Sequence, residues 1–421
     1  MASSDKQLVI LDGVRTPFAR MGSDLAGIDA VELGRQAVVA LLARTGLDPD
    51  LVDETIFGCV SQPAEAANIA RVIALRAGIP KSKPAMTVHR NCASSLESLT
   101  SAAEKMAAGR GQIYIVGGTE SMSRIPFYYP QATAEKFTAL SRARSLGQRM
   151  ALLAKFRPAD FAPRIGLKMG LTDPVVGLNM GETAEVLARE LGITRGEQDA
   201  FALASHLKAC ASRGKLAEEI APFYLPDSKA GFMSEDNGPR ANQTSEALAK
   251  LKPVFEPGTG TVTAGNSSQI TDGAVALLVA TRRRAESLGL QPLGRLVDYA
   301  WWGCDPERMG LGPVGAIRRV AATSGLRPDQ ADTIEINEAF AAQVLGVVKK
   351  LASEDASLTI PMEKLNPNGG AIALGHPVGA TGGRLILTAL KELARNGGKR
   401  ALVSLCIGGG QGGAAWFERE A

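Results

Sequence analysis

Apolar residues in the first 120 positions form short runs that alternate with longer stretches at helical spacing. The run at 8–11, followed by Asp12-Gly13, predicts a strand and a turn, and residues 30–46 carry the helical period with a closing glycine. The other predicted elements of this half are strands at 55–60, 85–88 and 112–116, the last ending in Gly117-Gly118, and a helix at 94–108. Because strands and helices alternate, the pattern predicts a buried, mainly parallel α/β sheet.

The second half of the chain repeats this order of elements. Residues 332–337 resemble the strand near 54–60, residues 375–393 form a turn that runs into a helix as 91–108 do, and residues 400–406 match 112–117. The period is far longer than that of a solenoid repeat, so the sequence predicts two copies of one α/β module. Between them, residues 121–270 show no clean alternation and predict an inserted lobe.

Composition narrows the classes of protein that fit this pattern. With 421 residues and 45% hydrophobic residues, the chain can bury a large core in two to four lobes, and a net charge of +4 is too small for a nucleic-acid binder. Five cysteines without a C-x-x-C pair argue against a disulfide framework or a structural zinc site, so we expect reduced thiols in a cytosol-like compartment. The polar N-terminus shows no export signal, and the longest apolar run, near 274–280, is too short to span a bilayer.

A basic segment at 136–168 stands out within the inserted region. Its eight cations face a single anion, Asp160, which gives a net charge of +7. Apolar residues recur among these charges at Leu140, Leu146, Met150, Leu153 and Phe156. This basic amphipathic pattern suits an anionic membrane surface or a partner groove, and equally a solvated helix that covers its own protein. Nucleotide phosphates could use some of the same charges.

Cys92 is the first candidate for chemistry. It lies in residues 88–95, on a turn that leads into the helix predicted at 94–108. The helix dipole favours a thiolate there, which makes Cys92 a candidate nucleophile, although a lone cysteine in an apolar protein is more often a small core residue. His89 precedes the same turn, and its role is ambiguous.

His376 and Cys406 lie in two glycine-rich segments near the C-terminus. Only three histidines occur in the chain, and the Gly-Pro frame around His376 lets a substrate approach it, whereas His206 is expected to be a partly exposed structural residue of a helix at 195–213. Cys406 opens a glycine turn whose backbone N–H groups can hold an oxyanion, although glycines also serve where packed elements cross. Two thiols and one imidazole on matching ends of duplicated modules suit acyl transfer.

With these motifs in this order, the sequence resembles the thiolases over nearly its whole length. The resemblance rests on Asn91-Cys92-Ala93-Ser94-Ser95, Asn337-Glu338-Ala339-Phe340, Gly375-His376-Pro377 and Cys406-Ile407-Gly408-Gly409-Gly410, supported by Arg15-Thr16-Pro17-Phe18 and Thr263-Ala264-Gly265-Asn266-Ser267-Ser268. It implies the thiolase fold, with two βαβαβαββ modules in five layers, α-β-α-β-α, and an inserted loop domain. The implied domains are an N-terminal module at 1–120 and 271–292, the loop domain at 121–270 and a C-terminal module at 293–421.

The resemblance also implies the roles of the site residues. Cys92 would take the acyl group, His376 would remove its proton and later help hold the thioester oxygen, and Cys406 would move the proton at the acetyl α-carbon. A water held by Asn337 would form one oxyanion site with His376, and the N–H groups of Cys92 and Gly408 would form the other. Coenzyme A is implied as a substrate along the inserted lobe, with no metal and no redox cofactor. The residues implied near it are Ser268, Ala264, Ala339, Phe340, Asn179 and Met180.

One departure from the family pattern bears on the substrate. Asn179-Met180 stands where many short-chain thiolases have His-Met, and together with the basic insert it resembles the thiolase subunit of fatty-acid β-oxidation complexes. The sequence therefore predicts a cytoplasmic 3-ketoacyl-CoA thiolase, with an acetoacetyl-CoA thiolase that runs the Claisen condensation as the alternative. A fatty-acyl condensing enzyme, which lacks the second thiol, and a catalytically silent thiolase-like binding protein are the other classes. We expect a homodimer or homotetramer, with residues 136–168 contacting a hydratase/dehydrogenase subunit or peripherally contacting a membrane.

Overall fold

A ten-stranded sheet forms the centre of the computed structural model, which describes residues 4–225 and 231–420. Residues 1–3, part of the polar N-terminal segment discussed above, lie outside the described residues. The strands of this sheet are β1 (Leu8–Arg15), β2 (Ala19–Arg20), β3 (Glu54–Gly58), β4 (Ala85–Val88), β5 (Ile113–Glu120), β10 (Thr271–Thr281), β11 (Gly294–Gly303), β12 (Thr333–Ile336), β13 (Arg400–Ile407) and β14 (Gln411–Arg419).

The strand order divides into two halves that follow the same rule. One half runs β4-β3-β5-β10-β1 and the other β12-β13-β14-β11, so β3, β5, β10 and β1 correspond to β12, β13, β14 and β11. Only β3/β4, β3/β5 and β12/β13 pair in parallel, and the prediction of a mainly parallel sheet is therefore wrong. Residues 408–410 explain part of the difference, because a three-residue turn between β13 and β14 can only produce an antiparallel hairpin. The two halves join where Val9 and Ile10 pair with β11.

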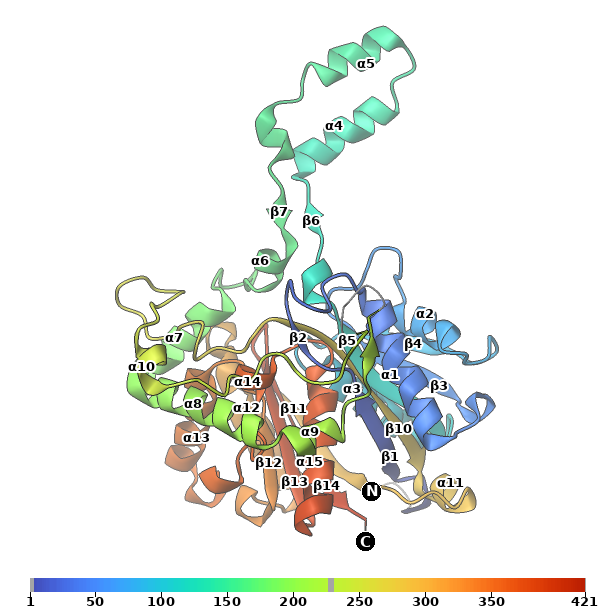
Figure 1. Ribbon diagram of the computed structural model, residues 1–421, viewed down its shortest axis with the longest axis vertical. Coiled ribbons are helices and arrows are strands. Elements are labelled where there is room, and N and C mark those ends of the chain that lie inside the picture. The colour runs from blue at the N-terminus through green and yellow to red at the C-terminus, as the bar shows by residue number, and fades with distance from the viewer. Residues whose placement is uncertain (1–3, 226–230, 421) are drawn as a thin grey trace.

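Helices arrange the two halves into five layers (Figure 1). Helices α1 (Ala30–Thr45) and α2 (Ile69–Arg76) cover one outer face, and α12 (Gly312–Ser324) and α13 (Ala341–Glu354) cover the other. Helices α3 (Ser94–Ala107) and α15 (Thr381–Asn396) contact each other between the half-sheets, where they bury the central apolar cluster. The predicted thiolase-type α-β-α-β-α arrangement of two related modules is confirmed, although in the second module the place of β4 is taken by a single bridge between Ile334 and Leu365.

Two strands extend beyond the glycines that were expected to end them. β1 continues through Asp12-Gly13 to Arg15 with a register shift after Ile10, and β5 continues through Gly117-Gly118 to Glu120. A Cβ at Gly117 would lie 2.1 Å from the carbonyl oxygen of Val275, so this glycine permits close strand packing instead of a turn.

The segment between β5 and β10 forms short helices and two small ribbons. His206 lies on one of these helices, at residues 195–211, is only 2% exposed and accepts a hydrogen bond from the Arg240 N–H at 3.2 Å, so the prediction of a partly exposed His206 is wrong. The elements here are β6 (Phe127–Tyr128), α4 (Gln131–Ser141), α5 (Leu146–Leu153), β7 (Arg164–Ile165), α6 (Gly166–Gly170), α7 (Met180–Glu190), α8 (Arg195–Ala211), α9 (Arg213–Ala217), β8 (Phe223–Tyr224), β9 (Phe232–Met233) and α10 (Ser245–Ala249).

Two further short helices complete the fold, α11 (Arg282–Ser287) and α14 (Ala371–Leu374). Within residues 4–225 and 231–420, no helix combines the length and apolar character needed to cross a bilayer.

Candidate active site

Cys92 lies on the turn between β4 and α3, held against the glycine turn of the other half. Asn91 adopts a left-handed backbone conformation with φ of 43°, which asparagine tolerates, and its Nδ2 donates to the Gly408 carbonyl at 2.7 Å. The backbone N–H groups of Gly408 and of Cys92 itself act on the Cys92 sulfur and lower its pKa. Segments more than 300 residues apart in the chain therefore meet at this sulfur.

The Cys92 thiol is protonated at rest. Burial of the sulfur raises the pKa of the Cys92 thiol to about 11, an effect that outweighs the two N–H donors, which lower it. The thiolate that the helix dipole was expected to favour is therefore not the resting form, because α3 begins only at Ser94 and desolvation of the sulfur outweighs the nearby N–H groups. A nucleophile at this position needs a neighbouring base.

His376 carries the features of that base. Its Nδ1 lies 2.6 Å from the hydroxyl oxygen of Thr381, and that hydroxyl donates to the Pro377 carbonyl at 3.1 Å. Because the hydroxyl proton is used on Pro377, the Nδ1 atom carries the ring proton and donates to Thr381. The Nε2 atom then keeps its lone pair, and it is buried without a partner among the described residues.

The environment of His376 keeps the ring neutral. Its side chain is 8% exposed, and burial together with the nearby Arg384 cation lowers the pKa of His376 to about 4. Around pH 7 the site thus pairs a neutral thiol with a neutral imidazole. Proton transfer from the sulfur to Nε2 is the step that would convert this thiol into a nucleophile.

The turn that holds His376 is anchored beside the turn that holds Cys92. At the start of α15 the Gly383 N–H donates to the Ser95 hydroxyl of α3 at 2.8 Å, and a Cβ on Gly382 would lie 2.8 Å from the Leu96 nitrogen. The His376 N–H donates to the Gln269 carbonyl at 2.9 Å. The two helices therefore begin side by side and bring the imidazole turn to the nucleophile turn.

Cys406 brings the second thiol to the same place. It lies at the end of β13 with 1% of its surface exposed, and burial together with the Cys92 sulfur raises the pKa of Cys406 well above its usual value. It packs in one apolar cluster with Met180, Ala339 and Phe340. A Cβ on Gly408 would lie 3.4 Å from the Met180 sulfur, so the same cluster borders the glycine turn.

The remaining predicted residues fall into two groups. Asn337 is fully buried at the end of β12, and neither its Oδ1 nor its Nδ2 has a partner among the described residues, which fits a side chain that holds a water or a substrate oxygen. The Ser268 N–H donates to the Ala339 carbonyl at 2.9 Å, on the same loop as the exposed Ala264.

Asn179 stands apart from this arrangement. Its side chain accepts from the Gly181 N–H at 3.0 Å and caps α7, so its amide serves the helix end.

The sequence analysis missed the supporting roles of three residues: Asn91, which it named only as part of a motif, Gln269 and Thr381. Thr381 lies five residues after His376 on the first turn of a helix, a spacing that a search for hydroxyls near the imidazole would have found. Asn91 bridges the two turns through its side chain, and only the fold shows that the Gly408 carbonyl is its partner.

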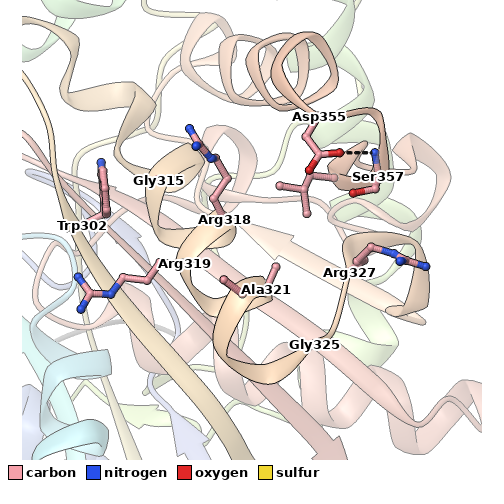
Figure 2. Close-up of a pocket in the computed structure, with 11 residues that line it drawn as sticks. Trp302, Gly315, Arg318, Arg319, Ala321, Gly325, Arg327, Asp355 and Ser357 are labelled. Atoms are coloured by element: carbon pink, nitrogen blue, oxygen red, sulfur yellow. Dashed lines mark hydrogen bonds between the residues drawn. The ribbon is translucent and has the colours of Figure 1, made fainter.

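A separate surface cavity of about 660 Å³ lies on the outer side of α12 (Figure 2). Trp302, Arg318, Arg319 and Arg327 border it, and Asp355 accepts from the Ser357 N–H at 2.9 Å on its far side. None of the predicted site residues lines this cavity, so the chemistry does not belong there.

Loss of the Thr381 hydroxyl should impair the base without removing it. In Thr381→Val the Nδ1 proton loses its acceptor and the tautomer with Nδ1 unprotonated becomes accessible, so we expect kcat to fall about 100-fold while KM changes little. Thr381→Ser should restore kcat to within a few-fold of the parent enzyme. Steady-state kinetics with thermal unfolding separate these effects, and a Thr381→Val enzyme with full kcat would contradict the role.

The comparisons with known proteins agree with this geometry. Residues 8–283 match the family model described as "Thiolase, N-terminal domain", and residues 290–419 match "Thiolase, C-terminal domain". An acetyl-CoA acetyltransferase of Pseudomonas aeruginosa is 42% identical over 99% of this chain and all of that protein. A 3-ketoacyl-CoA thiolase of Serratia proteamaculans is 40% identical over 98% of this chain and 97% of that protein.

Solved structures give the same result. The crystal structure of human mitochondrial 3-ketoacyl-CoA thiolase in complex with CoA superposes with a TM-score of 0.88 at 36% identity, with both chains fully covered. The acetyl-CoA acetyltransferase of Bacillus anthracis also gives a TM-score of 0.88 at 36% identity, over 98% of this chain and 99% of that one.

The fold and the site thus define an acyltransferase. The chain belongs to the thiolase family.

Proposed function

We propose that this protein is a degradative 3-ketoacyl-CoA thiolase, which uses CoA to cleave 3-ketoacyl-CoA into acetyl-CoA and a shortened acyl-CoA. The observation that carries the proposal is the unpartnered, buried Nε2 of a neutral His376 in a site that also holds the Cys92 and Cys406 thiols. One thiol needs a base to become a nucleophile, and the other remains protonated as an acid. Both requirements of the cleavage are met by these three side chains.

In the first half of the reaction, Cys92 transfers its thiol proton to His376 Nε2 and attacks the 3-keto carbon. The bond between carbons 2 and 3 breaks, and its electron pair stays on carbon 2 as the enolate of acetyl-CoA. The Cys406 thiol protonates that carbon, so acetyl-CoA leaves and a Cys406 thiolate remains. Backbone N–H groups at Gly408 and Cys92, and a water on Asn337, would stabilise the oxyanions.

In the second half, the Cys406 thiolate takes the thiol proton of an incoming CoA. The CoA sulfur attacks the acyl-Cys92 carbonyl, the shortened acyl-CoA leaves, and Cys92 regains its proton from the His376 imidazolium. Both thiols and the imidazole return to their starting states. The protein supplies every proton transfer, so we propose that CoA is a substrate and that no metal or redox cofactor takes part.

The choice of a degradative substrate rests on a narrower observation. Asn179 stands where short-chain enzymes have a histidine, and its side-chain oxygen caps α7. The apolar cluster that contains Met180 borders the site beside it. We propose that Ser268, Ala264, Ala339 and Phe340 lie along the pantetheine arm. The alternative is an acetoacetyl-CoA thiolase, the activity in the name of the Pseudomonas aeruginosa relative.

Cleavage rates for two substrates distinguish these functions. We expect kcat/KM for 3-ketopalmitoyl-CoA to exceed that for acetoacetyl-CoA by about tenfold or more, because additional methylenes bury apolar surface in the site. A ratio of about tenfold in the opposite direction would support the acetoacetyl-CoA enzyme. Cys92→Ala, assayed alongside with both substrates, measures the background rate.

The setting of the enzyme is also a proposal. Strand β4 forms the edge of the N-terminal half and pairs only with β3 among the described strands, which supports a homodimer or a homotetramer built on the sheet-bearing core. We propose a cytoplasmic enzyme of fatty-acid β-oxidation and lipid degradation. A hydratase/dehydrogenase subunit is one proposed partner of residues 136–168, and the structure of that segment favours a different contact, argued below.

A further inference from the structure

Residues 127–165 form an arm that stands away from the rest of the molecule. The short ribbon of β6 and β7 is its stalk, in which Phe127 pairs with Ile165 and Tyr128 with Arg164. Helices α4 and α5 lie at its far end, and Figure 1 places them at the extreme of the longest axis. A flat surface that approaches from this side meets α5 before any other part of the protein.

The arm has a small core of its own. The rings of Tyr129, Phe137, Phe156 and Phe161 form a chain of contacts with centroids 5.0 to 6.4 Å apart. Lys136 pairs with Asp160 at 2.6 Å across this core. Phe156 therefore faces inward, and the apolar stripe expected from the sequence divides into an inner part and an outer part.

The outer part of the stripe consists of three side chains on one face of α5. Leu146, Met150 and Leu153 occur at positions i, i+4 and i+7, and they are 76%, 60% and 48% exposed. The arm's own core does not use them. Helix α5 is therefore solvated, as one of the alternatives expected, but its apolar face does not cover the rest of the chain.

Exposed cations occur in the same segment of the chain as this apolar face. After Lys136 is paired, seven remain in the segment, and none of them forms an ion pair within the part of the chain that the structure describes. All seven are exposed: Lys168 lies on α6, and the six on the arm are Arg142, Arg144, Arg149, Lys155, Arg157 and Arg164.

We propose that the arm docks this enzyme on an anionic lipid bilayer, with Leu146, Met150 and Leu153 inserted among the headgroups and the cations on the lipid phosphates. An eight-residue helix is about 12 Å long and can lie in the interface without crossing the bilayer. The unpaired cations are spread over the whole arm. This distribution matches the diffuse negative charge of a lipid surface better than the localised anions of a protein groove.

The direction of the arm relates docking to the active site. Strands β4 and β5 both pair in parallel with β3, so their carboxyl ends lie at the same edge of the sheet. Cys92 follows β4, and the arm follows β5 after a single helical turn. Docking would therefore turn the edge that carries the nucleophile toward the membrane.

Vesicle flotation of the full chain tests the proposal. We expect binding to vesicles of phosphatidylcholine with phosphatidylglycerol, about tenfold weaker binding to pure phosphatidylcholine, and a comparable loss when the salt concentration rises from about 0.05 M to 0.5 M. The triple variant Leu146→Ser, Met150→Ser, Leu153→Ser and the pair Arg144→Glu, Arg149→Glu should each lose at least about tenfold in affinity.

Matched controls on the body of the protein make the result specific. The triple variant Leu75→Ser, Leu207→Ser, Met362→Ser changes side chains that are 41%, 49% and 43% exposed, and the pair Arg110→Glu, Arg283→Glu changes two exposed cations. Both controls should bind as the parent does. Absence of salt-sensitive vesicle binding, an equal loss in arm and body variants, or arm-dependent binding to a purified hydratase/dehydrogenase subunit but not to vesicles would overturn the proposal.

Discussion

Replacing Cys92 by serine should reduce thiolysis by about 10⁴-fold or more, with the fold intact. The hydroxyl is a far weaker nucleophile than a thiol, and the buried site that raises the pKa of the Cys92 thiol to about 11 disfavours an alkoxide even more strongly. No other thiol of the site can replace it, because Cys92 is the thiol whose pKa the Gly408 and Cys92 N–H groups lower. The measurement is kcat/KM for cleavage of a 3-ketoacyl-CoA at saturating CoA.

Cys210→Ser is the matched control, since it removes another partly exposed free thiol, on α8. It should keep the full rate. A Cys92→Ser enzyme that retains more than about 1% of the parent activity, with Cys210→Ser unchanged, would contradict the covalent mechanism.

Replacing Cys406 by alanine should separate the two chemical steps. Cleavage of the carbon–carbon bond needs an acid for the departing enolate, so we expect thiolysis to fall by about 10³-fold. Transfer of an acetyl group from acetyl-CoA to Cys92 expels a thiolate, which leaves more easily without an acid, and should remain measurable. If Cys406 had only a structural role, its replacement would slow carbon–carbon bond cleavage and acetyl transfer to the same extent.

Cys59→Ala is the control for this substitution, because Cys59 is another fully buried thiol. It should lose some stability and little activity. If Cys406→Ala thiolyses at the parent rate, the second thiol has no part in the reaction, and a condensing-enzyme mechanism with a single active cysteine becomes the better description.

Much of the fold followed from local pattern. The helix at 30–45 ends where expected because Gly46 takes the left-handed conformation that closes it, and β4 occupies residues 85–88 as predicted. The duplication was visible because matching strands carry matching glycine clusters near their C-terminal ends. The direction of the strands could not be predicted in the same way. The antiparallel strands β10 and β11 follow long or irregular connections, and a local hydrophobic pattern does not show in which direction the next strand runs.

The candidate site was predicted in its residues but not in its protonation state. Cys92, His376 and Cys406 were found from residue type and turn context, whereas the neutral thiol and neutral imidazole result from burial by segments distant in the chain. The Thr381 contact that fixes the imidazole tautomer is likewise a property of the packed turn. The apolar face of α5 points outward because the arm has a separate aromatic core. The spacing of apolar residues in the sequence did not show which of them belong to that core and which are exposed.

Acyl transfer to the nucleophile can be observed directly. Cys406→Ala would be mixed with acetyl-CoA, quenched in acid and digested, and the cysteine-containing peptides weighed by mass spectrometry. An acetyl group on the Cys92 peptide, absent when Cys92→Ser is combined with Cys406→Ala, is the predicted result. An acetyl group on another cysteine, or on none, would contradict the assignment of Cys92 as the acyl carrier.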